Sequence, residues 1–325
     1  MKKILTILLS FCLIFSCLSF GGCSKTNQSG VLTIYAPDGA PALALAKQIV
    51  DNDNFKTGRV ANYKIVKADV IGSKVIQGTG DIVILPVNAA TKLYNQGAYG
   101  KYKMVSVITH GNLYIMSSAP ITLNDLSNKT MGVIGQGQVP DLTLKSILIN
   151  NSIANVNINY YTRADEMIPM LKTGKLSIGL LPEPAASQLE KVASNITWHR
   201  LSVQELYDSQ TKEYPQAVVL VKESLLNLYP NLVENMKVAF TENITYLKEN
   251  VSQAVNAVNS RLEEGVSPSL NANTITSKVI DNCNIFWQDA VDSKDSVIKY
   301  VKNMININSI STAIPADDYF YVKEN

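Results

Sequence analysis

The chain carries one pattern of hydrophobic and polar positions twice. Each half opens with an apolar, β-rich run, a turn rich in Gly and Pro, and a helical pattern; this unit covers residues 31–50 and again residues 130–149. Each half later has an apolar run that ends in Leu-Pro and is followed by two alanines, in residues 81–93 and 177–189. Proline suits the first turn of a helix because its φ is fixed and its N–H is missing. The matching order and spacing predict two copies of one α/β unit; the alternative is a chance likeness between two ordinary α/β units.

Further apolar runs complete the two copies and continue beyond them. Residues 63–70 and 156–162 are predicted to be middle strands, each followed by a helix. Strands and helices that alternate at this length favour parallel sheets with crossover helices. A buried strand is predicted at residues 216–224, and helices are predicted at residues 230–249, 251–262, 275–289 and 293–303.

The link between the two copies, residues 102–122, is too long and too β-rich for one loop, and we predict a strand pair there. The chain is expected to return near residues 209–215. We therefore expect lobe 1 to consist of residues 31–116 and 211–325, and lobe 2 of residues 117–210. Two crossings between α/β lobes form a hinge that can close on a ligand.

The N-terminus has the pattern of an export signal. Lys2 and Lys3 precede the apolar run 4–20, and Gly-Gly-Cys follows, with Cys23 as the cysteine. A basic start, an apolar stretch and small residues are typical of a secretory signal, here residues 1–22. A plain membrane-spanning anchor is the alternative, for which the apolar run is short.

The cysteine after the small residues is typical of a bacterial lipoprotein signal. We expect Cys23 to be lipidated and the polar residues 23–30 to act as a tether; Cys17 is the alternative lipidation site. The mature protein would then be held at the outer face of the cytoplasmic membrane by a lipid anchor.

The net charge and the small numbers of Cys and His residues exclude several classes of function. Removing residues 1–22 takes two lysines from the 29 basic residues, so 27 basic residues face 27 acidic ones. A chain without a basic surplus is not attracted to nucleic acid. Beyond Cys23 only Cys283 remains, and the histidines are His110 and His199 alone. We therefore expect no internal disulfide, no metal, no cofactor and no catalytic His group.

The predicted strand ends supply the candidate binding residues. In open α/β sheets a ligand binds beyond the carboxyl ends of the strands, where helices begin and free N–H groups attract acceptors. Glycine in such turns lets the backbone approach a ligand. The residues expected to bind a ligand are Asp38, Gly39, Ala40, Pro41, Asn88, Ala89, Tyr114, Gln136, Gly137, Gln138 and Glu183.

The side chains in these turns favour a neutral or amine-bearing organic ligand, with a heteroaromatic one as an option. None of the four arginines lies at a predicted strand end, so no bidentate clamp for an anion is evident. Asp38 and Asp141 can alternatively be helix caps. Glu183 lies between two prolines and is a less obvious cap. Tyr35, Tyr114 and His110 could supply a stacking face, although buried aromatic residues more often belong to a core.

Several stretches together resemble the substrate-binding proteins of ABC importers, in the branch that binds nitrate, aliphatic sulfonates, taurine and thiamine-pyrimidine precursors. They are "APDGAPALALAK", "GDIVILPVNAATKLYNQG", "GQGQVPDLTLKSIL", "LLPEPAASQL", "YPQAVVLVKESLLNLYPNLV" and the closing "IPADDYFYV". The resemblance covers nearly all of the mature chain, in order. It implies a type II periplasmic-binding fold, with two hinged three-layer α/β lobes and a ligand cleft between them.

The resemblance also implies partners. These would be a small-molecule ligand and the permease and ATPase subunits of an ABC transporter, with the binding protein acting as a monomer. In pyrimidine-binding relatives, a Glu in the position of Glu183 accepts hydrogen bonds from ring amino groups. Two other functions stay open, because a fold does not fix a function: an enzyme acting on a small metabolite, and a ligand sensor for a membrane receptor.

Overall fold

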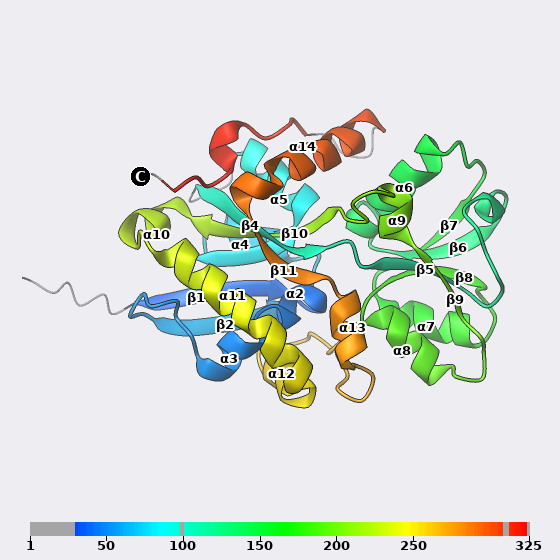
Figure 1. The fold of residues 1–325 in the computed structure, drawn as a ribbon, viewed down its shortest axis with the longest axis horizontal. Coiled ribbons are helices and arrows are strands. Elements are labelled where there is room, and N and C mark those ends of the chain that lie inside the picture. Colours follow the sequence, from blue (N-terminus) through cyan, green and yellow to red (C-terminus); the bar gives the residue numbers. More distant parts are fainter. Residues whose placement is uncertain (1–29, 98–100, 308–311, 324–325) are drawn as a thin grey trace, which may run out of the picture. The chain divides into compact units, whose positions relative to one another are not determined.

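The computed structural model describes residues 30–97, 101–307 and 312–323 (Figure 1). Contacts divide the chain into Met1–Gly30 and Val31–Asn325, and all described helices and strands lie in the second unit. The expected signal peptide, Cys23 and the tether as far as residue 29 lie outside the described residues. No helix within the described ranges is long and apolar enough to span a membrane.

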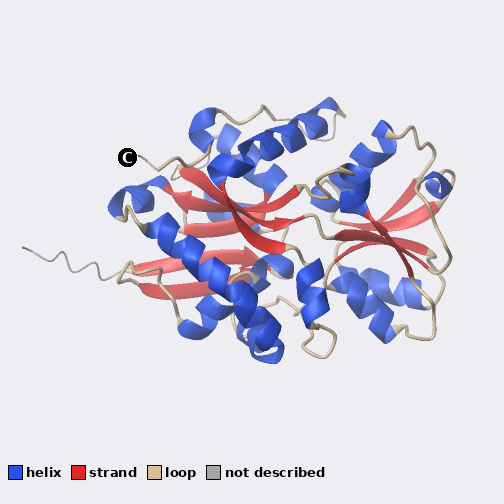
Figure 2. Ribbon diagram, viewed as in Figure 1, coloured by secondary structure: helices blue, strands red, loops and turns tan. Residues whose placement is uncertain are grey.

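The first sheet has six strands in the order β11-β4-β10-β3-β1-β2 (Figure 2). Its strands are β1 (Val31–Pro37), β2 (Val60–Val66), β3 (Ile82–Pro86), β4 (Tyr102–His110), β10 (Pro215–Lys222) and β11 (Ile285–Asp289). The strands of the first copy, β1, β2 and β3, are parallel, whereas β10 is antiparallel to β3 and to β4. The expectation of parallel sheets therefore holds within the copy and fails where the crossing strands join it.

The second sheet repeats this arrangement with five strands in the order β7-β6-β8-β5-β9. Its strands are β5 (Leu113–Ser117), β6 (Thr130–Ile134), β7 (Asn157–Tyr161), β8 (Ile178–Pro182) and β9 (His199–Ser202). The parallel order β7-β6-β8 matches β2-β1-β3, and an antiparallel crossing strand follows in both sheets. This shared order supports the two-copy interpretation over a chance likeness. The second sheet begins with β5, slightly before the division expected at residue 117.

Helices cover both faces of each sheet, so each lobe has three layers (Figures 1 and 2). In the first sheet, Ile34 and Ala36 pack in the cluster that includes α3 (Ala46–Asp51), α11 (Leu232–Glu249) and α12 (Val251–Asn259). Tyr35 packs in the cluster that includes α4 (Ile71–Ile76), α5 (Val87–Asn95) and α14 (Ala290–Asn306). In the second, Leu180 packs on the side of α6, and Leu181 on the side of α7 and α8. This alternation follows from the two-residue period of strand side chains.

The helices and 3₁₀ segments have these bounds: α2 (Ala40–Leu43), α3 (Ala46–Asp51), α4 (Ile71–Ile76), α5 (Val87–Asn95), η1 (Asn124–Leu126), α6 (Val139–Asn150), α7 (Ala164–Lys172), α8 (Ala185–Val192), α9 (Val203–Tyr207), α10 (Glu223–Leu228), α11 (Leu232–Glu249), α12 (Val251–Asn259), α13 (Ser277–Asn282), α14 (Ala290–Asn306) and η2 (Asp317–Tyr319).

One predicted helix was wrong. The segment 275–289 contains α13 followed by the strand β11, which pairs antiparallel with β4 at the edge of the first sheet. The run Ile285–Trp287 is β-branched and aromatic, which suits a pleated surface, and its position beside an unpaired edge decides its structure. The helix predicted after the first strand is also divided, into α2 and α3, and Pro41 is its second residue, not its first.

Two crossings connect the lobes, and they pack against each other. The first runs from β4 to β5 through Gly111 and Asn112, and the second enters β10 at Pro215. A Cβ on Gly111 would lie 2.6 Å from Tyr214 Cε1 and 2.8 Å from Gln204 Cβ. Only glycine allows these two segments to approach so closely. The two crossing segments therefore lie side by side, which is the arrangement that a hinge requires.

Candidate functional site

The candidate site lies where the strand ends of the first sheet face the second lobe. Asn88, in the first turn of α5, donates from Nδ2 to the carbonyl oxygen of Gly137 in the second lobe at 3.3 Å. Arg163 Nη2 donates to Ser267 O at 3.0 Å. Lys191 Nζ donates to Asn273 O. The first of these contacts joins a turn that the sequence marks in one half to a turn that it marks in the other. We refer to the region between the lobes as the cleft.

In the first lobe, Asp38 directly follows β1 and begins the turn into α2. Its Oδ2 accepts a hydrogen bond from the backbone N–H of Ser269 at 2.8 Å, while its buried Oδ1 has no partner among the described residues. Burial raises the pKa of this carboxyl, while hydrogen bonds from Ser269 and Gly39 and, least, the charge of Arg163 oppose the shift. Gly39 has φ 108°, a conformation that requires glycine, and leads into Ala40 and Pro41 at the start of α2.

In the second lobe, the turn Gln136–Gly137–Gln138 is held in place from behind. Asp141 Oδ2 accepts from the N–H of Gly137 at 2.8 Å and from Lys145 Nζ at 2.8 Å. Its Oδ1 accepts from Tyr160 at 2.9 Å. The Asp141 side chain is fully buried, so these contacts favour the helix-cap alternative for this residue. Gln136 and Gly137 themselves are exposed at the cleft.

Glu183 is buried, but its carboxylate already has partners in the protein. Oε1 accepts from Arg200 Nη1 at 2.5 Å, Ser187 Oγ at 2.9 Å and Asn282 Nδ2 at 3.3 Å. Oε2 accepts from the N–H of Ser187 at 3.1 Å, one of the free donors at the start of α8. The carboxylate therefore needs no ligand donor to offset its burial, and a direct ligand contact of Glu183 stays a prediction.

Arg200 is the site residue that sequence reasoning missed. It lies on β9, which was not predicted, and binds Glu190 through Nε at 2.6 Å and Nη2 at 2.8 Å besides its bond to Glu183. Its guanidinium also lies 5.0 Å from the ring centre of Tyr114. No pattern in the sequence predicts the contact between Arg200 and Glu183. The contact forms because β9 and β8 lie on either side of β5 in the folded sheet. The expectation that no arginine lies at a strand end also fails for Arg163, which directly precedes α7.

A cavity of about 790 Å³ opens beside this cluster, between α8 and β9 of the second lobe and α13 of the first, which Figure 1 shows next to α8. Tyr114, Trp198 and Arg200 line one wall, and Val279 and Asn282 line the other. The volume is in the range of small-molecule sites.

The other aromatic candidates do not line this cavity. His110 is 2% exposed and stacks on Phe286 with a centroid distance of 3.6 Å and an angle of 2° between planes. Burial lowers the pKa of His110 to about 3, so the ring is neutral. Tyr35 is 4% exposed and belongs to the core, with Lys74 Nζ 5.0 Å from its ring centre.

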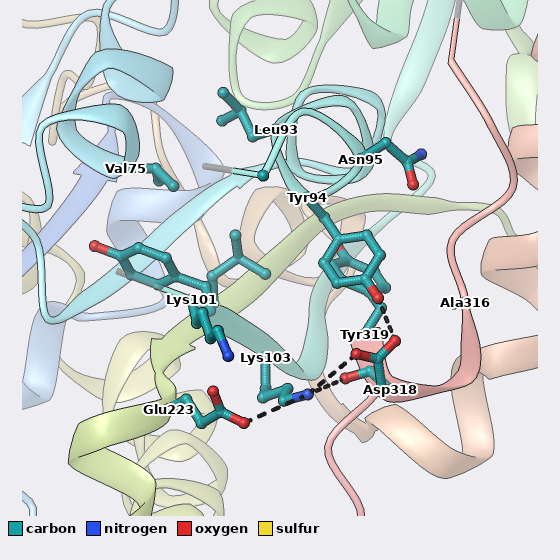
Figure 3. Close-up of a pocket in the computed structure, with 13 residues that line it drawn as sticks. Val75, Leu93, Tyr94, Asn95, Lys101, Lys103, Glu223, Ala316, Asp318 and Tyr319 are labelled. Atoms are coloured by element: carbon teal, nitrogen blue, oxygen red, sulfur yellow. Dashed lines mark hydrogen bonds and ion pairs between the residues drawn. The ribbon is translucent and has the colours of Figure 1, made fainter. Parts of the chain in front are cut away.

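A second cavity, of about 470 Å³, lies at the opposite end of the first sheet (Figure 3). This cavity lies where β4 begins and β10 ends. The cleft lies at the other end of these two strands. Lys103 there forms ion pairs with Glu223 and Asp318, both at 3.7 Å, and Tyr94 donates to Asp318. Its charged side chains thus neutralise one another, and the cavity is separate from the cleft.

Reactive groups are sparse in the part of the chain that the structure describes. No group of three His, Cys, Asp or Glu residues there could hold a metal ion. Cys283 is fully buried, and burial raises the pKa of its thiol well above the ordinary value. A thiol in that state is a poor nucleophile.

The solved structures that are similar to this chain include the following three. An ABC transporter protein from Parabacteroides distasonis has a TM-score of 0.74 and 19% identity, covering 91% of this chain and 100% of its own. The alkanesulfonate-binding protein from Xanthomonas axonopodis, solved with MOPS bound, has a TM-score of 0.63 and 12% identity, covering 90% and 98%. A Candida albicans gene product described as having the generic periplasmic binding protein fold has a TM-score of 0.52 and 10% identity, covering 89% and 92%.

No protein-family model and no curated protein matches the sequence. The structural similarities, at identities below 20%, show a shared fold. This chain therefore has the periplasmic-binding fold that its sequence predicts.

We predict that Arg200 stabilises the protein mainly by neutralising Glu183. Arg200→Met leaves a buried carboxylate without its charge partner and should lower the free energy of unfolding by about 3 kcal/mol, measured by urea denaturation. Adding Glu183→Gln to that variant should restore most of the loss. Arg261→Met, which changes an exposed arginine, is the control and should cost less than about 0.5 kcal/mol. Equal losses in the single and double variants would contradict this explanation.

We also predict that His110 makes stability depend on pH. Its pKa is about 3 in the folded protein and about 6.5 when unfolded, so between these values only the unfolded chain takes up the proton. Stability should therefore fall as the pH drops through this range, by about 2 kcal/mol from pH 8 to pH 5 relative to His110→Asn. Urea denaturation at both pH values measures the difference. Parallel losses in the two proteins would mean that His110 is not the cause.

Proposed function

We propose that this protein is an extracytoplasmic solute-binding lipoprotein that captures a small organic molecule between its lobes and delivers it to an ABC permease. The observation that carries this proposal is the hydrogen bond from Asn88 to Gly137, which joins a strand-end turn of the first copy to a strand-end turn of the second. The similar structures, which include an alkanesulfonate-binding protein and an ABC transporter protein, support solute capture. Lobe 1 would comprise residues 31–116 and 211–325, and lobe 2 residues 117–210.

In this proposal, the ligand lies against the strand ends Asp38–Pro41, Asn88–Ala89, Gln136–Gln138 and Glu183, with Tyr114 and the cavity beside it at the mouth. Helix starts offer backbone N–H groups there, and the side chains supply acceptors. Transfer of an unchanged ligand requires no reacting group, which agrees with a buried Cys283 and a neutral, stacked His110. Closure would occur about the two crossings at Gly111 and Tyr214.

We predict that uptake of one small molecule depends on this protein. A strain without the gene should fail to deplete from the growth medium a compound that the parent strain depletes, as followed by mass spectrometry. The purified protein should bind that compound and release it with unchanged mass. A changed mass would indicate an enzyme, and identical depletion by both strains would contradict the transport proposal.

We further predict that Cys23 carries the lipid. Cys23→Ala should abolish labelling by palmitate and move the protein from the membrane fraction to the soluble extracytoplasmic fraction. Cys17→Ala is the matched control and should leave both properties unchanged. Continued labelling of Cys23→Ala would show that the lipid is attached elsewhere.

A further inference from the structure

Two neighbouring strand ends each hold one buried hydrogen-bond acceptor without a partner among the described residues. Asp38 uses Oδ2 to accept from Ser269 N–H, and Asn88 uses Nδ2 to donate to Gly137 O. Because a carbonyl oxygen can only accept, the Asn88 contact identifies its other amide atom as oxygen. The buried Asp38 Oδ1 and Asn88 Oδ1 have no partner among the described residues.

The two acceptors follow adjacent parallel strands of the first sheet. β1 and β3 are parallel, with Ile34 opposite Ile82 and Tyr35 opposite Val83, so both strands end at the same edge of the sheet. Asp38 is the first residue after β1, and Asn88 is the second after β3. Asn88 touches Gly137 of the second lobe, so this edge lies against the other side of the cleft.

The charge of Asp38 favours a cation at this edge of the sheet, whereas Lys191 and Lys278 line the cavity beside α8. Asp38 is a half-buried carboxylate without an ion pair among the described residues, and burial raises its pKa despite the hydrogen bonds from Ser269 and Gly39 and the attraction of Arg163. The two nearby arginines are already engaged, since Arg163 binds Asp165 at 2.9 Å and Arg200 lies between Glu183 and Glu190. An anion would meet the Asp38 charge and no free guanidinium, whereas a cation would offset the cost of burying that charge.

We propose, building on the solute-binding function, that Asp38 and Asn88 form the recognition site for a small organic cation with several N–H donors, such as an ammonium, guanidinium or amidinium group. One N–H donates to Asp38 Oδ1 in a charge-assisted hydrogen bond, and another donates to Asn88 Oδ1. Tyr114 and Trp198, which line the adjoining cavity, provide apolar surface for the rest of the molecule.

The first test needs no ligand. Asp38→Asn keeps the side-chain shape and an oxygen for the Ser269 N–H, but removes the buried charge. We expect the melting temperature of the ligand-free protein to rise by about 2 °C or more, as is common when a residue kept for function is neutralised. Asp295→Asn, an exposed position on α14, is the control and should leave it unchanged. A lower melting temperature for Asp38→Asn would overturn the proposal, because the charge would then stabilise the empty protein.

The second test compares three probes of similar size by thermal shift and calorimetry. Benzamidine, with charge and N–H donors, should stabilise the wild-type protein and the Asp295→Asn control, and its affinity should fall at least tenfold in Asp38→Asn. Benzenesulfonate, an anion, and benzyltrimethylammonium, a cation without N–H donors, should bind at least tenfold more weakly. Failure of benzamidine to bind, or tighter binding of either other probe, would overturn the ligand class.

These outcomes are distinguishable from failure of the proposed function. A protein that prefers benzenesulfonate and is still required for depletion of a solute would be a solute-binding protein for anions, so only the ligand class would be wrong. Benzamidine binding that depends on Asp38, without any gene-dependent depletion, would keep the cation site and remove the transport function.

Discussion

The close packing of the two crossings determines where every strand end of the cleft lies. Gly111 has no room for a Cβ because Tyr214 and Gln204 lie against it. The same segment is tied to both lobes, since Asn112 O accepts from Glu183 N–H at 2.9 Å and Gly111 O accepts from Asn284 Nδ2 at 3.2 Å. β4 of the first sheet thus ends, and β5 of the second begins, at one closely packed segment.

Charge pairing then determines what kind of surface the cleft presents. Arg200 is held by Glu183 and Glu190, and Arg163 by Asp165, so the arginines near the cleft are matched by carboxylates. Asp38 has no such partner, which leaves the strand edge of the first lobe rich in acceptors. The structurally similar alkanesulfonate-binding protein was solved with a sulfonate-containing molecule, MOPS. A shared fold does not fix the ligand, so this likeness does not determine the charge of the molecule that this chain binds.

The repeated hydrophobic pattern was sufficient to predict two α/β copies and two crossings between them. These features depend on periodicity and on the position of Gly and Pro, both of which are local properties of the chain. The helix predicted over residues 275–289 failed at β11, and β9 was not predicted at all. Both are short strands that pair at or near a sheet edge, so a distant partner decides their conformation.

For the site, the sequence by itself determined which residues stand at the strand ends. Of these, Asn88 contacts Gly137 and Asp38 contacts Ser269, and their contact with a ligand stays a prediction. The tertiary structure alone decided which of their polar atoms are free. Glu183 has an arginine partner from β9, whereas Asp38 keeps one oxygen unpaired. Residue type and spacing fix the local turn, but whether a buried carboxylate is neutralised depends on donors that folding brings from elsewhere in the chain.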